Sequence, residues 1–108
     1  KAGLKALEMD TNLQKAADLR AQEISKKFSH TRPDGSSFST VLGEFGVKYK
    51  KSGENIAYGY NTAEKVMNAW MNSQGHRANI LNSDFEKIGI GVYTDSNGTV
   101  YWQQTFIK

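Results

Sequence analysis

The stretch I-G-I-G-V-Y-T-D-S-N-G-T-V-Y-W-Q-Q-T-F-I, residues 88–107, decides the fold. Two runs of alternating side chains flank a turn signal at residues 95–98, which is the pattern of a β-hairpin. Because two strands are not stable alone in water, this hairpin needs a third strand and covering helices. Residues 56–60 are the natural third strand. Gly89 and Gly91 share one face of their strand, where either a packed helix or a ligand can approach closely.

A long helix is predicted upstream of these strands. Residues 13–28 place apolar side chains at three- and four-residue steps, which indicates an amphipathic helix with Phe28 on its buried face. Asp10 is a good capping residue just before it. Glu23 and Lys27 have the i,i+4 spacing of a solvent-facing ion pair.

Shorter helices are predicted in the middle of the chain. The first is expected over residues 36–45. Asn61 and Glu64 have the spacing of a capping box at the start of the next. That helix is expected to place three large side chains in the core: Met67, Trp70 and Met71. Residues 77–81 predict one further turn.

Size and composition restrict the protein class. A chain of 108 residues is long enough to bury roughly two-thirds of its unfolded surface, so residues 1–108 are expected to form one domain. The net charge of +3 comes with scattered lysines and no basic stripe, so no nucleic-acid partner is expected. The absence of cysteine removes disulfides and thiolate chemistry without fixing the compartment. No apolar run approaches the ~18 residues of a transmembrane segment.

Two histidines restrict where imidazole chemistry can occur. His30 and His76 both lie beside turn residues, and Glu54 stands at the mouth of the predicted third strand. Two imidazoles and one carboxylate are the minimum set for an open zinc site, but the spacing alone favours two unrelated polar histidines over a shared site. A Ser-His-acid triad through Ser73 competes with this interpretation. It is disfavoured because Ser73 lacks the G-x-S-x-G context that exposes a nucleophile.

Several of these segments occur together in a known order. In this chain they are S-H-T-R-P-D-G around His30, G-E-N-I-A over 53–57, W-M-N-S-Q-G-H-R-A-N-I-L over 70–81, I-G-I-G-V-Y over 88–93 and Y-W-Q-Q-T-F over 101–106. The combination resembles the CAP superfamily, also called the SCP domain (cysteine-rich secretory protein, antigen 5, pathogenesis-related 1). More narrowly, it resembles the compact, cysteine-free bacterial branch of that superfamily.

The resemblance implies an α+β fold, a three-layer α-β-α sandwich around a small antiparallel sheet. It also implies a central cleft lined by two histidines and two acidic residues, a quartet that can hold a divalent metal in animal and plant members. His30, Glu54 and His76 match three of the four positions, and Ser73 stands where the second acid is expected. Loss of such a partner typically weakens metal binding by about 10- to 100-fold. We therefore expect no required cofactor, and at most a weakly bound divalent metal such as zinc on His30 and His76.

Family members usually have a further helix before the K-A-G-L segment at residues 1–4, and this chain is expected to lack it.

The resemblance also carries an expected function. The favoured hypothesis is a secreted or surface-exposed bacterial binding module, located outside the cell or on its surface. Its cleft residues, His30, Glu54, Ser73 and His76, would accept a small polar, lipid or cell-wall ligand. The alternative is a metal-assisted hydrolase in which His30 and His76 hold the metal and Glu54 is the general base.

Overall fold

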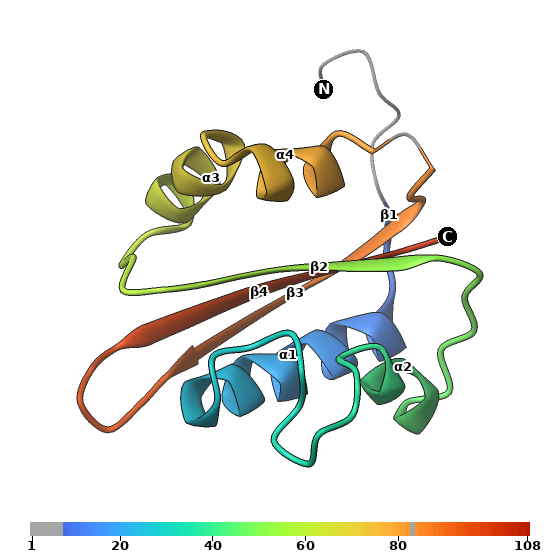
Figure 1. Ribbon diagram of the computed structural model, residues 1–108, viewed down its shortest axis with the longest axis horizontal. Coiled ribbons are helices and arrows are strands. Elements are labelled where there is room, and N and C mark those ends of the chain that lie inside the picture. Colours follow the sequence, from blue (N-terminus) through green and yellow to red (C-terminus); the bar gives the residue numbers. More distant parts are fainter. Residues whose placement is uncertain (1–7, 83) are drawn as a thin grey trace.

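A four-stranded sheet forms the middle layer of the protein (Figure 1). The computed structural model describes residues 8–82 and 84–108. The elements are β1 (Glu8–Met9), α1 (Thr11–Lys26), α2 (Thr40–Glu44), β2 (Ser52–Tyr58), α3 (Ala63–Met71), α4 (Gln74–Ile80), β3 (Lys87–Thr94) and β4 (Val100–Ile107). Helices α1 and α2 cover one face of the sheet, and α3 and α4 cover the other (Figure 1). The predicted α+β class and three-layer sandwich are confirmed.

The sheet has the strand order β1-β3-β4-β2. Strands β3 and β4 form the predicted antiparallel hairpin, and β2 pairs antiparallel with the other side of β4 as the third strand. Gly98 closes the hairpin turn with a φ of 84°, a conformation that glycine adopts without steric cost. The sheet is not wholly antiparallel, because Glu8 and Met9 pair in parallel with Lys87 and Ile88. A two-residue strand is too short for a period-two pattern, so the sequence did not predict it.

Helix α1 begins at its predicted cap and ends earlier than predicted. The Asp10 carboxylate accepts a hydrogen bond of 3.0 Å from the Leu13 backbone N–H. The apolar face of the helix is buried as expected: Leu13, Ala16, Ala17, Ala21 and Ile24. The prediction was wrong for Phe28, which is 46% exposed because the helix stops at Lys26 and the chain leaves the helical period. Its ring instead meets Tyr58 edge-on at 4.8 Å.

Glycines in β3 let α1 lie directly on the sheet. A Cβ atom at Gly89 would lie 2.6 Å from the Leu13 carbonyl oxygen, and one at Gly91 would clash with the Ala17 carbonyl oxygen. The sequence allowed either a packed helix or a ligand on the face of Gly89 and Gly91. The structure places a packed helix there. This close approach places the α1 backbone at Leu13 and Ala17 directly against β3.

The outer edge of β3 is covered by one side chain of α1. Strand β1 pairs only with Lys87 and Ile88, so the remaining β3 residues have no neighbouring strand on that side within the described part of the chain. The Gln14 side-chain amide donates to the Ile90 carbonyl oxygen and accepts a hydrogen bond of 3.0 Å from the Ile90 N–H. Gln14 thus occupies the positions that a neighbouring strand would use.

Helices α3 and α4 begin at other residues than predicted. Thr62, not Asn61, caps α3, because its hydroxyl accepts a hydrogen bond of 3.2 Å from the Lys65 N–H. The predicted capping box at Asn61 and Glu64 was therefore wrong by one residue. Trp70 is buried as expected, whereas Met67 and Met71 are only partly buried. Helix α4 begins at Gln74, before the predicted turn, and buries no side chain completely.

We predict that Gly91→Ala destabilises the protein, because the new methyl group forces α1 away from β3. Overpacking of this kind costs about 1–3 kcal/mol, measured as the free energy of unfolding in urea. Gly43→Ala is the matched control, since nothing lies within 4 Å of a Cβ at that helical position. The control is expected to leave stability unchanged or to raise it by less than ~1 kcal/mol. Equal stability of both variants would contradict the close helix–strand contact.

Candidate functional site

The candidate site lies at β2, an edge strand of the sheet. Consecutive strand residues point to opposite faces, so Glu54 meets the α1 layer and Asn55 meets the α4 layer. His30, in the segment after α1, contacts Glu54, and His76 belongs to α4. Each outer layer therefore contributes one of the two histidines to the same strand.

Glu54 is held by four hydrogen bonds. Arg20 donates from Nε to Oε2 at 2.7 Å and from Nη2 to Oε1 at 2.9 Å. His30 Nδ1 lies 2.8 Å from Oε1, and Gln103 Nε2 donates to Oε2 at 2.8 Å. A carboxylate offers about four lone-pair positions, so this one is fully used. The side chains of Arg20 and Glu54 are both 0% exposed.

A wider ion-pair network supports this carboxylate. Arg20 also donates to Glu23 at 3.0 Å, and Arg32 donates to Glu23 and to Glu44 at 2.6 Å each. Glu23 is therefore not the solvent-facing partner of Lys27 that its spacing predicted. Burial acts to lower the pKa of Arg20, but hydrogen bonds and charges from Glu54 and Glu23 outweigh it and raise that pKa. Arg20 thus remains charged within the core.

Glu54 determines how His30 is oriented. An ionised carboxylate only accepts hydrogen bonds, so we assign the proton in this contact to His30 Nδ1. Nε2 of the neutral ring then keeps its lone pair. The His30 side chain is 57% exposed, so the pair joins a buried anion to an imidazole that solvent can reach.

Ser73 and His76 form a second pair. The Ser73 hydroxyl lies 2.9 Å from His76 Nδ1, and although Ser73 occupies the N-cap position of α4, its side chain makes no capping bond. Burial, and then the charge of His30, lower the pKa of His76. No carboxylate contacts His76 in the part of the chain that the structure describes, so the Ser73 pair lacks the acid of a triad.

Side-chain amides attach α4 to β2. Asn79 Nδ2 donates to Asn55 Oδ1 at 3.0 Å and to the Glu54 carbonyl oxygen at 3.2 Å. Asn55 Nδ2 in turn donates to the His76 carbonyl oxygen at 3.1 Å and to Gln104 Oε1 at 3.0 Å. These bonds set the position of His76 relative to Glu54.

Sequence reasoning missed Arg20 and the amides of Asn55 and Gln103. Arg20 lies on the apolar face of α1, three and four residues from Ala17 and Ile24. A charged residue in that series is the signal that was available, because it requires a buried partner of opposite charge. Asn55 and Gln103 gave no such signal, since their roles depend on strand pairing.

The residues present do not fit a resident zinc ion. Across residues 8–82 and 84–108, no group of three or more His, Asp, Glu or Cys side chains is placed to hold a metal ion. Glu54 has no free lone pair, which leaves one nitrogen on His30 and one on His76. Zinc sites take three or four protein ligands, so two imidazoles are too few.

The sandwich and the histidine pair at its edge strand define an SCP-type domain. The model of the cysteine-rich secretory protein family, CAP, matches residues 1–106, and the chain belongs to this family. Among curated relatives, it is 47% identical over 109 residues to the uncharacterised protein YkwD of Bacillus subtilis, covering 99% of this chain and 41% of that protein. It is 36% identical over 110 residues to YlbC, described as a membrane protein of the same species, covering 100% and 30%. The chain therefore spans less than half of either relative.

Solved structures share the fold. An extracellular protein containing an SCP domain from Bacillus anthracis superposes with a TM-score of 0.89 at 29% identity, covering 99% of this chain and 35% of that one. An outer surface protein from Borrelia burgdorferi gives 0.88 at 26% identity, covering 99% and 80%. None of the helices in the described residues is long and apolar enough to cross a membrane.

We predict that Glu54→Gln destabilises the protein strongly, because Arg20 then keeps a buried charge without its main partner. Breaking a buried pair in this way costs about 3–5 kcal/mol, measured by urea unfolding. Asp84→Asn is the control, since it removes an exposed partner of Lys51 and should leave the unfolding midpoint unchanged. A Glu54→Gln midpoint equal to that of the control would refute the role of this pair.

We predict that the pKa of His76 lies below its ordinary value of 6.5 and rises in His30→Ala, because the positive charge of the protonated His30 ring is removed. Imidazole NMR titration measures both. Since the unfolded chain binds this proton more readily, the His76 contribution lowers stability as the pH falls through the range below 6.5. Lys26→Gln removes a positive charge that does not act on His76, so the titration midpoint of His76 is expected to stay unchanged in this variant. A midpoint unaffected by His30→Ala would exclude the coupling.

Proposed function

We propose that this chain is the CAP domain of a secreted or surface-exposed bacterial protein and acts as a binding module. Its site consists of His30, Glu54, Ser73 and His76. Location outside the cell is supported by the two solved neighbours, which are described as an extracellular and an outer surface protein.

The saturated Glu54 carboxylate carries this proposal. Its four hydrogen bonds fix the His30 ring before any ligand arrives, so little conformational freedom is lost on binding. The same bonds leave no lone pair on Glu54 to accept a proton from water. The arrangement therefore suits recognition better than chemistry.

The polar groups of the site favour a small polar ligand over a lipid. His30 Nε2 is an acceptor in the neutral ring, and the Ser73–His76 pair adds a hydroxyl and a second imidazole. A hydroxyl-bearing molecule, such as a sugar of the cell wall, offers donors and acceptors to both. We therefore propose a cell-wall sugar as the ligand class.

The hydrolase alternative and a resident metal are less well supported. A general base needs a free lone pair, and Glu54 has none while Arg20, Gln103 and His30 are in place. The site as proposed requires no metal. If the domain does catalyse a reaction, His30 is the better base, because Glu54 orients its ring and leaves Nε2 available.

We predict that chitotetraose, added to ¹⁵N-labelled protein, shifts the NMR signals of His30, Glu54, Ser73 and His76. His30→Ala and His76→Ala should each weaken binding about fivefold, as expected for the loss of one hydrogen bond. Lys26→Gln should bind like the parent. Shifts produced only by dodecylphosphocholine would replace the sugar with a lipid, and binding unaffected by either histidine variant would refute the site.

Two further assays test the alternative directly. Calorimetric titration with zinc should give no saturable binding in the parent protein. Saturable zinc binding that both histidine variants lose, together with peptide, ester or peptidoglycan hydrolysis that is lost in Glu54→Gln while its NMR spectrum still shows the folded domain, would establish the metal-assisted hydrolase instead.

A further inference from the structure

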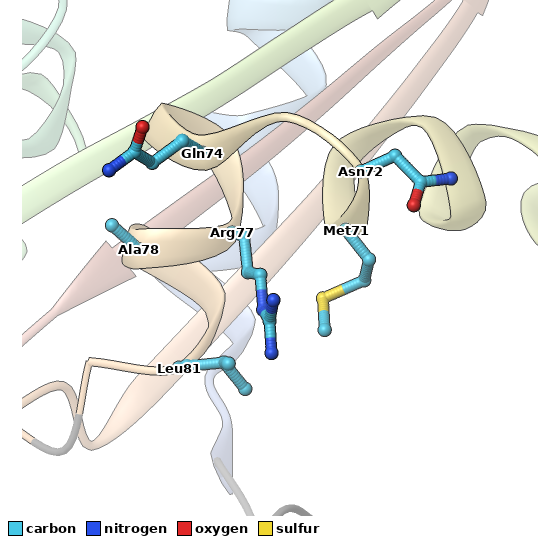
Figure 2. Close-up of a pocket in the computed structure, with 6 residues that line it drawn as sticks. All are labelled: Met71, Asn72, Gln74, Arg77, Ala78 and Leu81. Atoms are coloured by element: carbon cyan, nitrogen blue, oxygen red, sulfur yellow. The ribbon is translucent and has the colours of Figure 1, made fainter.

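A pocket apart from the candidate site lies on the outer surface of the α3–α4 layer (Figure 2). It has a volume of about 410 Å³ and is open to solvent. None of the four candidate-site residues lines this pocket. Its lining residues are Met71, Asn72, Gln74, Arg77, Ala78 and Leu81. Asn79 and Ile80 make the sheet contacts of α4. Because a helix turns 100° per residue, Gln74, Arg77 and Ala78 lie on the side away from the sheet.

Arg77 is the distinctive residue of this pocket. The chain has three arginines, and the other two, Arg20 and Arg32, each bind two glutamates. Arg77 has no carboxylate within salt-bridge distance among residues 8–82 and 84–108. The guanidinium in the pocket is therefore available to an anion from outside the chain.

The guanidinium of Arg77 lies next to apolar side chains. Figure 2 shows Met71, Arg77 and Leu81 extending toward the same space, while the amides of Asn72 and Gln74 point away from it on opposite sides. Met71 and Leu81 are partly buried, so they offer apolar surface next to the charge. Ala78 leaves room where a larger side chain would fill the pocket.

From this arrangement we propose that the pocket binds the free C-terminal carboxylate of a short peptide. The planar guanidinium of Arg77 matches a carboxylate with two parallel hydrogen bonds. Met71 and Leu81 offer apolar surface beside the guanidinium to a side chain of the peptide. The volume lies in the lower part of the ~300–1,000 Å³ range of ligand pockets, which suits two or three residues. This site is separate from the proposed sugar site and does not depend on it.

The test is an NMR titration of ¹⁵N-labelled protein with N-acetyl-Ala-Leu and with its C-terminal amide. The acid should shift signals of the lining residues Met71, Arg77, Ala78 and Leu81 more than that of His76. The amide should bind roughly tenfold more weakly, because it lacks the charge that Arg77 pairs with. Arg77→Gln should weaken binding of the acid by a similar factor. Arg77→Lys should also weaken it, because an ammonium group cannot form the two parallel hydrogen bonds of a planar guanidinium. Lys65→Gln, which removes an exposed charge from α3 outside the pocket lining, should bind like the parent.

Each other outcome overturns the proposal. Equal binding of acid and amide excludes carboxylate recognition, and unchanged affinity in both Arg77 variants excludes the pocket. Shifts centred on His30 and His76 place the peptide at the other site, and no shifts at millimolar peptide mean no binding. Chitotetraose titrated into Arg77→Gln should behave as in the parent, so failure of one site is distinguished from failure of the other.

Discussion

The buried pair of Arg20 and Glu54 is the interaction on which the rest of the structure depends. Removing two charges from water is costly, and a buried pair is tolerated only when the geometry is good and the remaining hydrogen-bonding positions are filled. Here Gln103 and His30 fill those of Glu54, and Glu23 and the Ser29 carbonyl oxygen fill those of Arg20. The pair fastens α1 to the edge strand β2 and, through Ser29 and Glu54, determines where the segment carrying His30 lies. Packing, electrostatics and the candidate site therefore meet at one carboxylate.

Local periodicity explains what could be predicted from the sequence. The hairpin, the third strand and helix α1 follow from patterns of two and 3.6 residues, which act between near neighbours. Phe28 was misplaced because a helical period says nothing about where the helix stops. Ile90 and Val92 are 38% and 49% exposed although they are the apolar residues of their strand, because the glycine face is the one that α1 covers. Which face of a strand is buried depends on its partner, and the partner is distant in sequence.

The candidate site, like the fold, was predictable only in part from the sequence. Motifs indicated His30, Glu54, Ser73 and His76, but they could not indicate how these residues pair. That depends on the pleat of β2, which turns Glu54 toward α1 and Asn55 toward α4, and on Arg20, which lies 34 residues before Glu54. The sequence motif gave no partner for the Glu54 carboxylate, whereas in the fold all its hydrogen-bonding positions are occupied. This saturation agrees with the binding hypothesis, which the sequence already favoured over metal chemistry.

The contact between Gln14 and Ile90 has a consequence for contacts between molecules. An exposed strand edge with apolar side chains is a template on which a second chain can add a strand. At β3, a strand from another molecule would have to displace the Gln14 amide from both the N–H and the carbonyl oxygen of Ile90 before pairing there. The glycines that admit α1 therefore also bring a blocking group to the sheet edge. One helix side chain thus protects the hairpin from extension at Ile90, one of its exposed apolar residues.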